Sequence, residues 1–364
     1  MKRNIYLKTI PPAEAVARVK ASIDREALIR EETIPSHEAS GRVLAHAVHA
    51  RYSSPTFHSA AMDGYAVNAR STFAAREGHP LTLKAGETCF AVNTGHPMPE
   101  GCDAVIMIEQ VVLDGGSVTI EAPAFPWQHV RRIGEDIVAT ELLFPRNHQL
   151  RPWDVGALLS GGIWDVPVWE RVTVRIIPTG DEVLDFTTHP DPGKGQVVES
   201  NSQMLAALAR ELGCVVERAA PVPDNPEALH QALKDSLDAG RHLTIFCAGS
   251  SAGSKDFTRA TLEKEGEILT HGIAAMPGKP SLLANCRGRL VAGAPGYPVS
   301  ALVCFKELLE PLISWLSHRE PPAKTVVPVE LTRTVPSRPG VEEHVRVSIG
   351  RVGDKLVATP LGRG

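Results

Sequence analysis

Polar and charged residues follow four apolar, strand-like runs in the second half of the chain. The runs are 172–178, 243–247, 273–275 and 290–292, and each leads into small residues, glycines or acids. If these runs belong to an α/β sheet, the segments after them lie where such sheets bind ligands, outside the carboxyl ends of the strands. Hydroxyl groups, a lysine and three carboxylates in these segments are typical of a site for a phosphorylated ligand with a cation.

The acids of this group have more than one explanation. Asp181 and Glu182 directly follow the first run, and carboxylates there can hold Mg²⁺ or accept protons. Asp256 precedes an expected helix. Helix capping or plain solvent exposure would account for Asp181 and Asp256 equally well.

The remaining segments favour anion binding. The loop 249–254 has three serines and two glycines, which allow close backbone approach to an anion. Its residue order is not that of a Walker A loop, which argues against an ordinary ATPase. Lys279 lies between Pro277-Gly278 and Pro280, so ordering it on a ligand costs less entropy. Pro295–Pro298 form a second rigid segment just before an expected helix.

Alternating strands and helices position these segments. Strands are expected at 172–178, 214–219 and 243–247, helices at 202–212 (capped by Asn201), from Asp224 to 240, near 256–264 and at 298–309, and a hairpin at 281–292. This alternation predicts a mostly parallel sheet with helices on both faces.

The rest of the chain has shorter elements. We expect helices at 11–29 and 151–166, and short strands between 81 and 149 that form a small β domain. After residue 320 the pattern is again β-like, but three strands make a marginal domain, so we expect the natural domain to continue beyond this chain.

Composition narrows the classes of protein. The chain has 364 residues, 43% of them hydrophobic, and a formal charge of −4, which argues against bulk binding to nucleic acid. No apolar run reaches the ~20 residues that cross a bilayer. Six scattered cysteines without a Cys-x-x-Cys pair indicate reduced thiols in the cytoplasm rather than zinc sites or disulfides.

Three segments further upstream place polar groups on loops of the expected β domain. Residues 58–67 contain Asp63 in a small-residue turn, 92–105 form a proline-stiffened loop, and 131–136 contain paired arginines and acids. Each segment taken alone is typical of an ordinary turn.

These segments, in this order, resemble the molybdopterin molybdenumtransferase family, which includes the gephyrin E domain. The resemblance runs from about residue 11 to the end. It rests on the following motifs: Ser59–Val67, Thr94-Gly95 with Pro97 and Pro99, Arg131–Asp136, Thr179–Glu182, Gly278-Lys279-Pro280 and Pro298–Ala301.

The resemblance implies a multidomain α/β plus β protein. A discontinuous, elongated N-terminal domain would comprise 1–55 and 146–171, with a small β domain inserted at 56–145. A doubly wound, molybdopterin-binding α/β domain would comprise 172–322, and a shortened C-terminal β domain 323–364.

The resemblance also implies an activity. Family members insert molybdenum from molybdate into adenylylated molybdopterin, with release of AMP and with Mg²⁺ or a similar cation assisting. The protein would be a cytoplasmic homodimer whose active sites are shared between subunits. Molybdopterin adenylyltransferase would be its upstream partner, and neither nucleic acid nor membrane would be a partner.

Carried over by position, the resemblance implies three sets of residues. The catalytic residues would be Asp63, Thr94, Asp136, Glu182, Asp256 and Lys279. The substrate-binding residues would be Thr179, Gly180, Asp181, Asp224, Gly249, Ser250, Ser251, Gly253, Pro277, Gly278, Pro280, Pro295, Gly296, Pro298 and Ser300. The cation would lie near Glu182 and Asp256.

Three positions depart from the family pattern. Met276 stands where the family has a lysine, Ala248 replaces a glycine before the serine loop, and Tyr297 replaces an asparagine. A molybdopterin-binding paralogue that carries or senses the cofactor without inserting metal is therefore the alternative to the enzyme. A scaffold dimer with a peptide-binding groove is a third reading, which no residue pattern supports.

Overall fold

The computed structural model describes residues 8–247 and 257–362, and the chain divides into two compact units. The β unit is Thr33–Val168, and the α/β unit joins Met1–Glu32 to Trp169–Gly364. The chain passes between the units in β1 (Glu31–Pro35) and in β12 (Asp165–Trp169). The division into four domains expected above stays a prediction.

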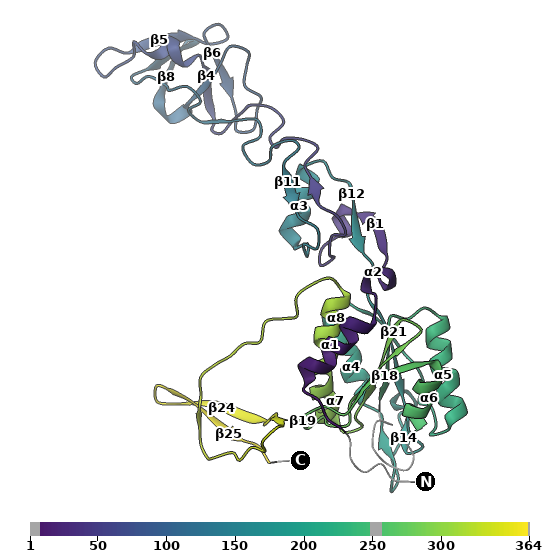
Figure 1. Ribbon diagram of the computed structural model, residues 1–364. Coiled ribbons are helices and arrows are strands. Elements are labelled where there is room, and N and C mark those ends of the chain that lie inside the picture. Colours follow the sequence, from purple (N-terminus) through teal and green to yellow (C-terminus); the bar gives the residue numbers. More distant parts are fainter. Residues whose placement is uncertain (1–7, 248–256, 363–364) are drawn as a thin grey trace. The chain divides into compact units, whose positions relative to one another are not determined.

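A six-stranded sheet forms the centre of the α/β unit (Figure 1). Its order is β16 (Val215–Arg218), β13 (Thr173–Pro178), β17 (Leu243–Cys247), β21 (Arg289–Ala294), β20 (Leu282–Cys286) and β18 (Gly266–His271). The first four strands run parallel, and β20 and β18 are antiparallel to their neighbours. All five residues of β17 are buried, as expected for a central strand covered on both faces.

Helices cover both faces of this sheet, which confirms the doubly wound fold (Figure 1). One layer contains α1 (Pro12–Ser22), α4 (Asn201–Glu211), α7 (Pro298–Cys304), a π-helical turn (Phe305–Leu309) and α8 (Glu310–Leu316). The other contains α5 (Pro226–Asp238) and α6 (Phe257–Glu265). Leu229, Leu233 and Leu237 of α5 pack with Ile177 and Phe246 of the strands, because they repeat at helical spacing along one face.

The C-terminal part adds short strands. β22 (Glu330–Leu331), β25 (Lys355–Pro360) and β24 (Val347–Val352) form a three-stranded sheet. β23 (Glu342–Glu343) instead pairs in parallel with β19 (Ala275–Met276). Two further short strands, β14 (Val183–Leu184) and β15 (Val197–Val198), pair with each other.

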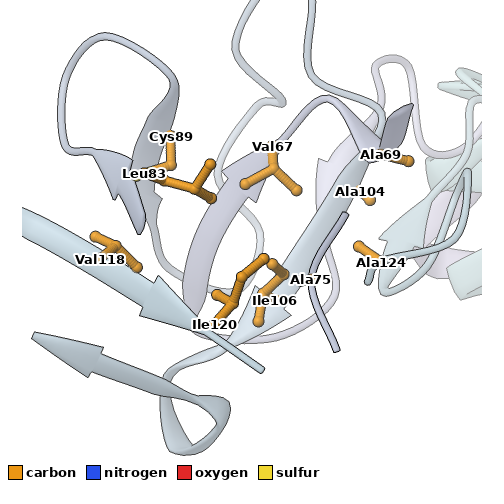
Figure 2. Close-up of a cluster of buried hydrophobic side chains, with 10 residues drawn as sticks. All are labelled: Val67, Ala69, Ala75, Leu83, Cys89, Ala104, Ile106, Val118, Ile120 and Ala124. Carbon is orange, nitrogen blue, oxygen red and sulfur yellow. The ribbon is translucent and has the colours of Figure 1, made fainter. Parts of the chain in front are cut away.

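The β unit contains two three-stranded sheets that share one core. One sheet is β6 (Cys89–Val92), β4 (Gly64–Val67) and β7 (Ala104–Met107), and the other is β5 (Leu81–Lys84), β9 (Ser117–Ile120) and β8 (Val111–Asp114). Figure 2 shows their apolar side chains gathered together, among them Val67, Leu83, Ile106, Val118 and Ile120. The unit also contains α3 (Pro152–Ser160) and the strand pairs β2 (Val48–His49) with β11 (Leu142–Phe144) and β3 (Ser59–Ala60) with β10 (Val130–Arg131).

Two predicted helices are shorter than expected. The segment 11–29 breaks after Ser22, because the Asp24 carboxylate accepts the backbone N–H groups of Glu26 and Ala27 and caps a second helix, α2 (Arg25–Leu28). The segment 151–166 is helical only to Ser160, and its last residues belong to β12. Within the described ranges, no helix has the length and apolar character that a bilayer crossing requires.

Candidate active site

Three of the predicted loops lie along one edge of the α/β sheet. Because β13, β17 and β21 are parallel, the segments after Pro178 and Ala294 leave the sheet on the same side. β20 is antiparallel to β21, with Leu282 opposite Gly293, so the loop that precedes β20 meets this edge as well. This edge is called the rim below. The order of the strands thus brings together segments more than a hundred residues apart.

The loop after β13 is held by its own backbone and by Asp181. The buried Thr179 donates both its N–H (3.0 Å) and its hydroxyl (3.1 Å) to Cys247 O, so this hydroxyl joins two strands. Gly180 has a φ of +135°, and a Cβ there would lie 2.8 Å from the Val183 side chain. The Asp181 carboxylate accepts the backbone N–H of Asp224 at 3.0 Å. Asp181 therefore positions the segment before α5.

Glu182 and Asp224 differ in their exposure. The Glu182 side chain is exposed to solvent, whereas Asp224 is half-buried. The Glu182 carbonyl accepts the N–H of Val197, which fixes its backbone, and both carboxylate oxygens lie 3.0 Å from where a Cβ on Gly180 would be. Of the two acids after β13, Glu182 is the one whose carboxylate is presented at the rim.

The loop before β20 presents an exposed lysine on a fixed backbone. Gly278 has a φ of +112°, and a Cβ there would lie 3.2 Å from the Val303 side chain. Its carbonyl accepts the Ser281 hydroxyl at 2.7 Å, and the Lys279 carbonyl accepts the N–H of Ile273 at 2.9 Å. Lys279 itself is exposed. This arrangement is suited to binding an oxyanion, because the loop backbone has little conformational freedom left to lose on binding.

The loop after β21 is fastened to the start of α4. Asn201 Nδ2 donates to Gly296 O at 2.7 Å, and Tyr297 O accepts the N–H of Ala301 in the first turn of α7. Pro295 is buried, while Tyr297 is 81% exposed. The expectation that Asn201 caps α4 is wrong, because Asn201 is the first residue of this helix and its amide reaches the neighbouring loop instead.

The Glu199 carboxylate caps α4 instead, and it belongs to a buried polar network. It accepts the Ser202 N–H at 2.7 Å and the Ser202 hydroxyl at 2.5 Å. Arg218 Nε donates to the Ser202 hydroxyl at 2.9 Å, and its guanidinium pairs with Asp185. The Thr187 backbone N–H and Arg218 hold the pKa of Asp185 below its usual range. Arg218 ends β16, so the rule for sheet edges would have found it if it had been applied to that strand.

Four of the other predicted binding residues lie within the described ranges. Pro277, Pro280 and Ser300 are half-buried, and Pro298 is exposed at the start of α7. The remaining predicted residues lie outside the described ranges: Gly249, Ser250, Ser251, Gly253 and Asp256.

Met276 has an acid as its neighbour on the adjacent strand. In the parallel pairing of β19 with β23, Met276 lies opposite Glu343, and the His344 N–H donates to Met276 O at 2.8 Å. Residues opposite each other in a ladder have side chains on the same face. In this register, position 276 therefore has a carboxylate rather than a second cation beside it.

In the β unit, the predicted residues lie on neighbouring loops. The Asp63 carboxylate accepts the Thr94 N–H at 2.7 Å and the Thr94 hydroxyl at 3.0 Å. These hydrogen bonds, the backbone one first, lower the pKa of Asp63, so it stays ionised to lower pH. Asp136 accepts from Arg131 Nη2 at 2.5 and 2.6 Å.

β3 connects these two pairs. Ser59 lies opposite Arg131 in β10 and also forms a bridge with Pro97, and Ala60 O accepts the N–H of Gly95. The three upstream segments singled out in the sequence are therefore side by side in one unit.

A cation at the rim would have few protein ligands. No group of three or more His, Cys, Asp or Glu side chains among the described residues is placed to hold a metal ion. Mg²⁺ is usually held by one or two carboxylates together with water and substrate phosphates, so an exposed glutamate at the rim is compatible with it. The donor set fits Mg²⁺ bound with the substrate better than a closed structural metal site.

Two family models match the chain. Residues 10–162 match the MoeA N-terminal region (domain I and II), and residues 175–315 match a probable molybdopterin binding domain. The second match contains the whole rim.

Named relatives agree with these matches. A molybdopterin molybdenumtransferase of Haemophilus influenzae is 34% identical over 309 residues, which cover 79% of this chain and 74% of the relative. Molybdopterin molybdenumtransferase 2 of Mycobacterium tuberculosis is 34% identical over 308 residues, covering 78% and 74%.

A solved structure extends the likeness to nearly the whole chain. The molybdopterin biosynthesis MoeA protein of Pyrococcus horikoshii aligns with a TM-score of 0.79 at 28% identity, and the alignment covers 98% of this chain and 90% of that one. The family predicted from the motifs and the predicted fold class are both confirmed. The chain belongs to the molybdopterin molybdenumtransferases, transferases of molybdenum cofactor biosynthesis.

Proposed function

We propose that this protein inserts molybdenum from molybdate into adenylylated molybdopterin and releases AMP. In the hydrolytic step, water adds to a phosphorus of the anhydride, the P–O bond to the leaving phosphate breaks, and AMP departs. Negative charge grows on the phosphate oxygens during this step, so groups that neutralise it accelerate the reaction. The observation that carries the proposal is the meeting of the 179–182, 277–281 and 295–298 loops at one rim.

Each rim residue has a role that its surroundings support. Lys279 is exposed on a fixed loop and would bind phosphate or molybdate oxygens. Glu182 is an exposed carboxylate that would hold Mg²⁺, together with Asp256. When bound, Mg²⁺ would supply charge neutralisation at the phosphates. Asp181 and Thr179 would act indirectly, because their side chains already hold the backbone of the rim.

The β unit would complete the site in a homodimer. Asp63 and Asp136 are held by donors of their own unit and would orient water or a second cation beside the rim of the partner subunit. The substrate would come from molybdopterin adenylyltransferase, and both proteins would act in the cytoplasm.

The alternative is a molybdopterin-binding paralogue that carries or senses the cofactor. It is favoured by the acid opposite Met276, since an oxyanion site with one lysine and a nearby carboxylate holds molybdate less strongly. The exposed Tyr297 is also compatible with binding without turnover.

One assay separates the two functions. The purified full chain is incubated with adenylylated molybdopterin, Mg²⁺ and molybdate, and both AMP release and binding of the pterin are measured. AMP release that requires the protein supports the enzyme. Tight binding without AMP release supports the carrier. The absence of both AMP release and pterin binding would contradict both proposals.

A further inference from the structure

The ring of Tyr297 is an exposed aromatic surface at the rim. Its side chain is 81% exposed, the highest exposure among the large aromatic side chains of the described residues. It lies in the loop between β21 and α7, which shares the rim with Glu182 and Lys279. An exposed tyrosine offers a large apolar face together with a polar tip, which is typical of residues that contact ligands.

The backbone that carries this ring is rigid on both sides. Gly296 O is held by Asn201 Nδ2 at 2.7 Å, and Pro298 locks its own φ angle at the start of α7. Tyr297 O accepts the N–H of Ala301 at 2.9 Å. Only the two side-chain torsions of Tyr297 remain to be ordered, so the protein would lose little conformational entropy when the ring stacks on a planar ligand.

We propose that Tyr297 stacks on a planar heteroaromatic ring of the bound substrate and so sets affinity for it. This inference rests on the proposed function, which supplies two such rings, the pterin and the adenine. Both have a π-face that an aromatic side chain can cover, and the charged rim would hold the phosphates between them.

The test compares binding of molybdopterin with binding of adenylylated molybdopterin. Equilibrium dissociation constants are measured with the full chain, for the natural protein and for Tyr297→Ala and Tyr297→Phe. Loss of stacking in Tyr297→Ala should weaken binding roughly ten- to hundredfold, whereas Tyr297→Phe should stay within about threefold. Trp153→Ala, at a tryptophan 68% exposed on α3 of the β unit, is the matched control and should bind as the natural protein does.

The two ligands identify the ring. An equal loss for both ligands in Tyr297→Ala assigns the contact to the pterin, and a loss confined to the adenylylated ligand assigns it to the adenine. In AMP release, losing a stacking contact to a ring away from the reacting phosphorus should raise the KM of Tyr297→Ala and leave its kcat unchanged. A purely structural effect of the substitution would lower kcat as well.

Three results would overturn the proposal. Tyr297→Ala could bind both ligands as the natural protein does, Tyr297→Phe could lose as much affinity as Tyr297→Ala, or the natural protein could bind neither ligand. Failure of the proposed function is distinguishable, because a natural protein that binds molybdopterin without releasing AMP leaves the comparison of dissociation constants intact.

Discussion

The predicted site acids of the β unit are already paired, whereas the exposed charges of the α/β rim face solvent. Asp63 accepts two hydrogen bonds from Thr94, and Asp136 is paired with Arg131. Glu182 and Lys279, by contrast, are exposed side chains on backbones that are themselves fixed.

This difference indicates a division of labour. Groups oriented in advance avoid reorganisation during the reaction, which is how preorganised dipoles and charges favour a transition state. Exposed charges on rigid loops gain their partners only when ligand binds. They therefore determine the affinity for the ligand and the stabilisation of the charge that develops on it. Substitutions in each unit test whether the two units differ in this way.

Glu182→Ala should give the largest effect. If the exposed carboxylate holds the cation beside the phosphates, its removal should lower AMP release by roughly a hundredfold or more. The melting temperature should be nearly unchanged, since an exposed substitution usually changes stability by less than about 0.5 kcal/mol. Single-turnover AMP release and thermal unfolding measure the two quantities.

A matched substitution controls for loss of surface charge. Glu211 is exposed at the end of α4, the helix whose first residue contacts the rim loop, so Glu211→Ala should keep full activity. Full activity of Glu182→Ala would remove the rim glutamate from the reaction.

Thr94→Val tests the preorganised side. The variant loses the hydroxyl that donates to Asp63 at 3.0 Å but keeps the backbone N–H at 2.7 Å. The lost hydroxyl helps to orient the carboxylate before the reaction, so AMP release should fall by roughly tenfold.

The pH profile of Thr94→Val gives a second readout. Thr94 lowers the pKa of Asp63, so loss of one donor raises that pKa. A step that needs the ionised carboxylate should then fail at a higher pH than in the natural protein. Thr82→Val removes an exposed hydroxyl that pairs with Thr119 in the same unit and should leave the profile unchanged. An unshifted acid limb in Thr94→Val would argue against Asp63 as the ionised group.

The sequence was sufficient for much of this arrangement. Strands that end in glycine and acid, alternating with amphipathic helices, predict both a parallel sheet and the edge where its loops meet. The glycines expected in these loops are needed at Gly180 and Gly278, because their backbone angles exclude most side chains. These features are local, and local patterns are what a sequence shows directly.

Features that depend on tertiary approach were missed. Asn201 was expected to cap its own helix, but its amide reaches Gly296, which lies 95 residues further along the chain. The sheet-edge rule indicates Arg218 at the end of its strand, but no spacing in the sequence indicates that it meets Asp185 and Ser202. The pairing of Met276 with Glu343 likewise depends on a strand from the C-terminal part of the chain.

Met276→Lys tests whether the rim lacks a second positive charge. A second cation should strengthen the grip on an oxyanion, and AMP release that depends on molybdate should rise by up to about tenfold. Glu343 lies opposite this position and would partly neutralise the new charge. The double variant Met276→Lys, Glu343→Gln should therefore gain more than the single one.

The outcome also bears on the departure from the family pattern. No gain in either variant would mean that another residue supplies the missing charge, for instance Lys255 of the loop after β17, which lies outside the described residues. The molybdate dependence of AMP release measures this directly. If another residue already supplies the charge, the half-saturating molybdate concentration of the variants equals that of the natural protein.

The smallest effect is expected at His242, away from the rim. Its imidazole is buried and has polar partners. The Thr173 N–H donates to His242 Nδ1 at 3.0 Å, and Nε2 lies 3.4 Å from Glu170. Burial lowers the pKa of His242, with Arg289, Arg30 and Arg241 adding to the effect and Glu170 opposing it.

Since the folded protein binds this proton less readily than the unfolded chain, the stabilisation is present above the ordinary imidazole pKa of about 6.5 and is lost as pH falls from there towards the lower folded-state pKa. His242→Gln should cost about 1 kcal/mol or less at pH 7.5, because an amide oxygen can still accept the Thr173 N–H. Its melting temperature should decline less between pH 7.5 and 5 than that of the natural protein, with His49→Gln, an exposed histidine of β2, as the control. Equal declines in His242→Gln and the natural protein would show that His242 does not link the stability of the α/β unit to pH.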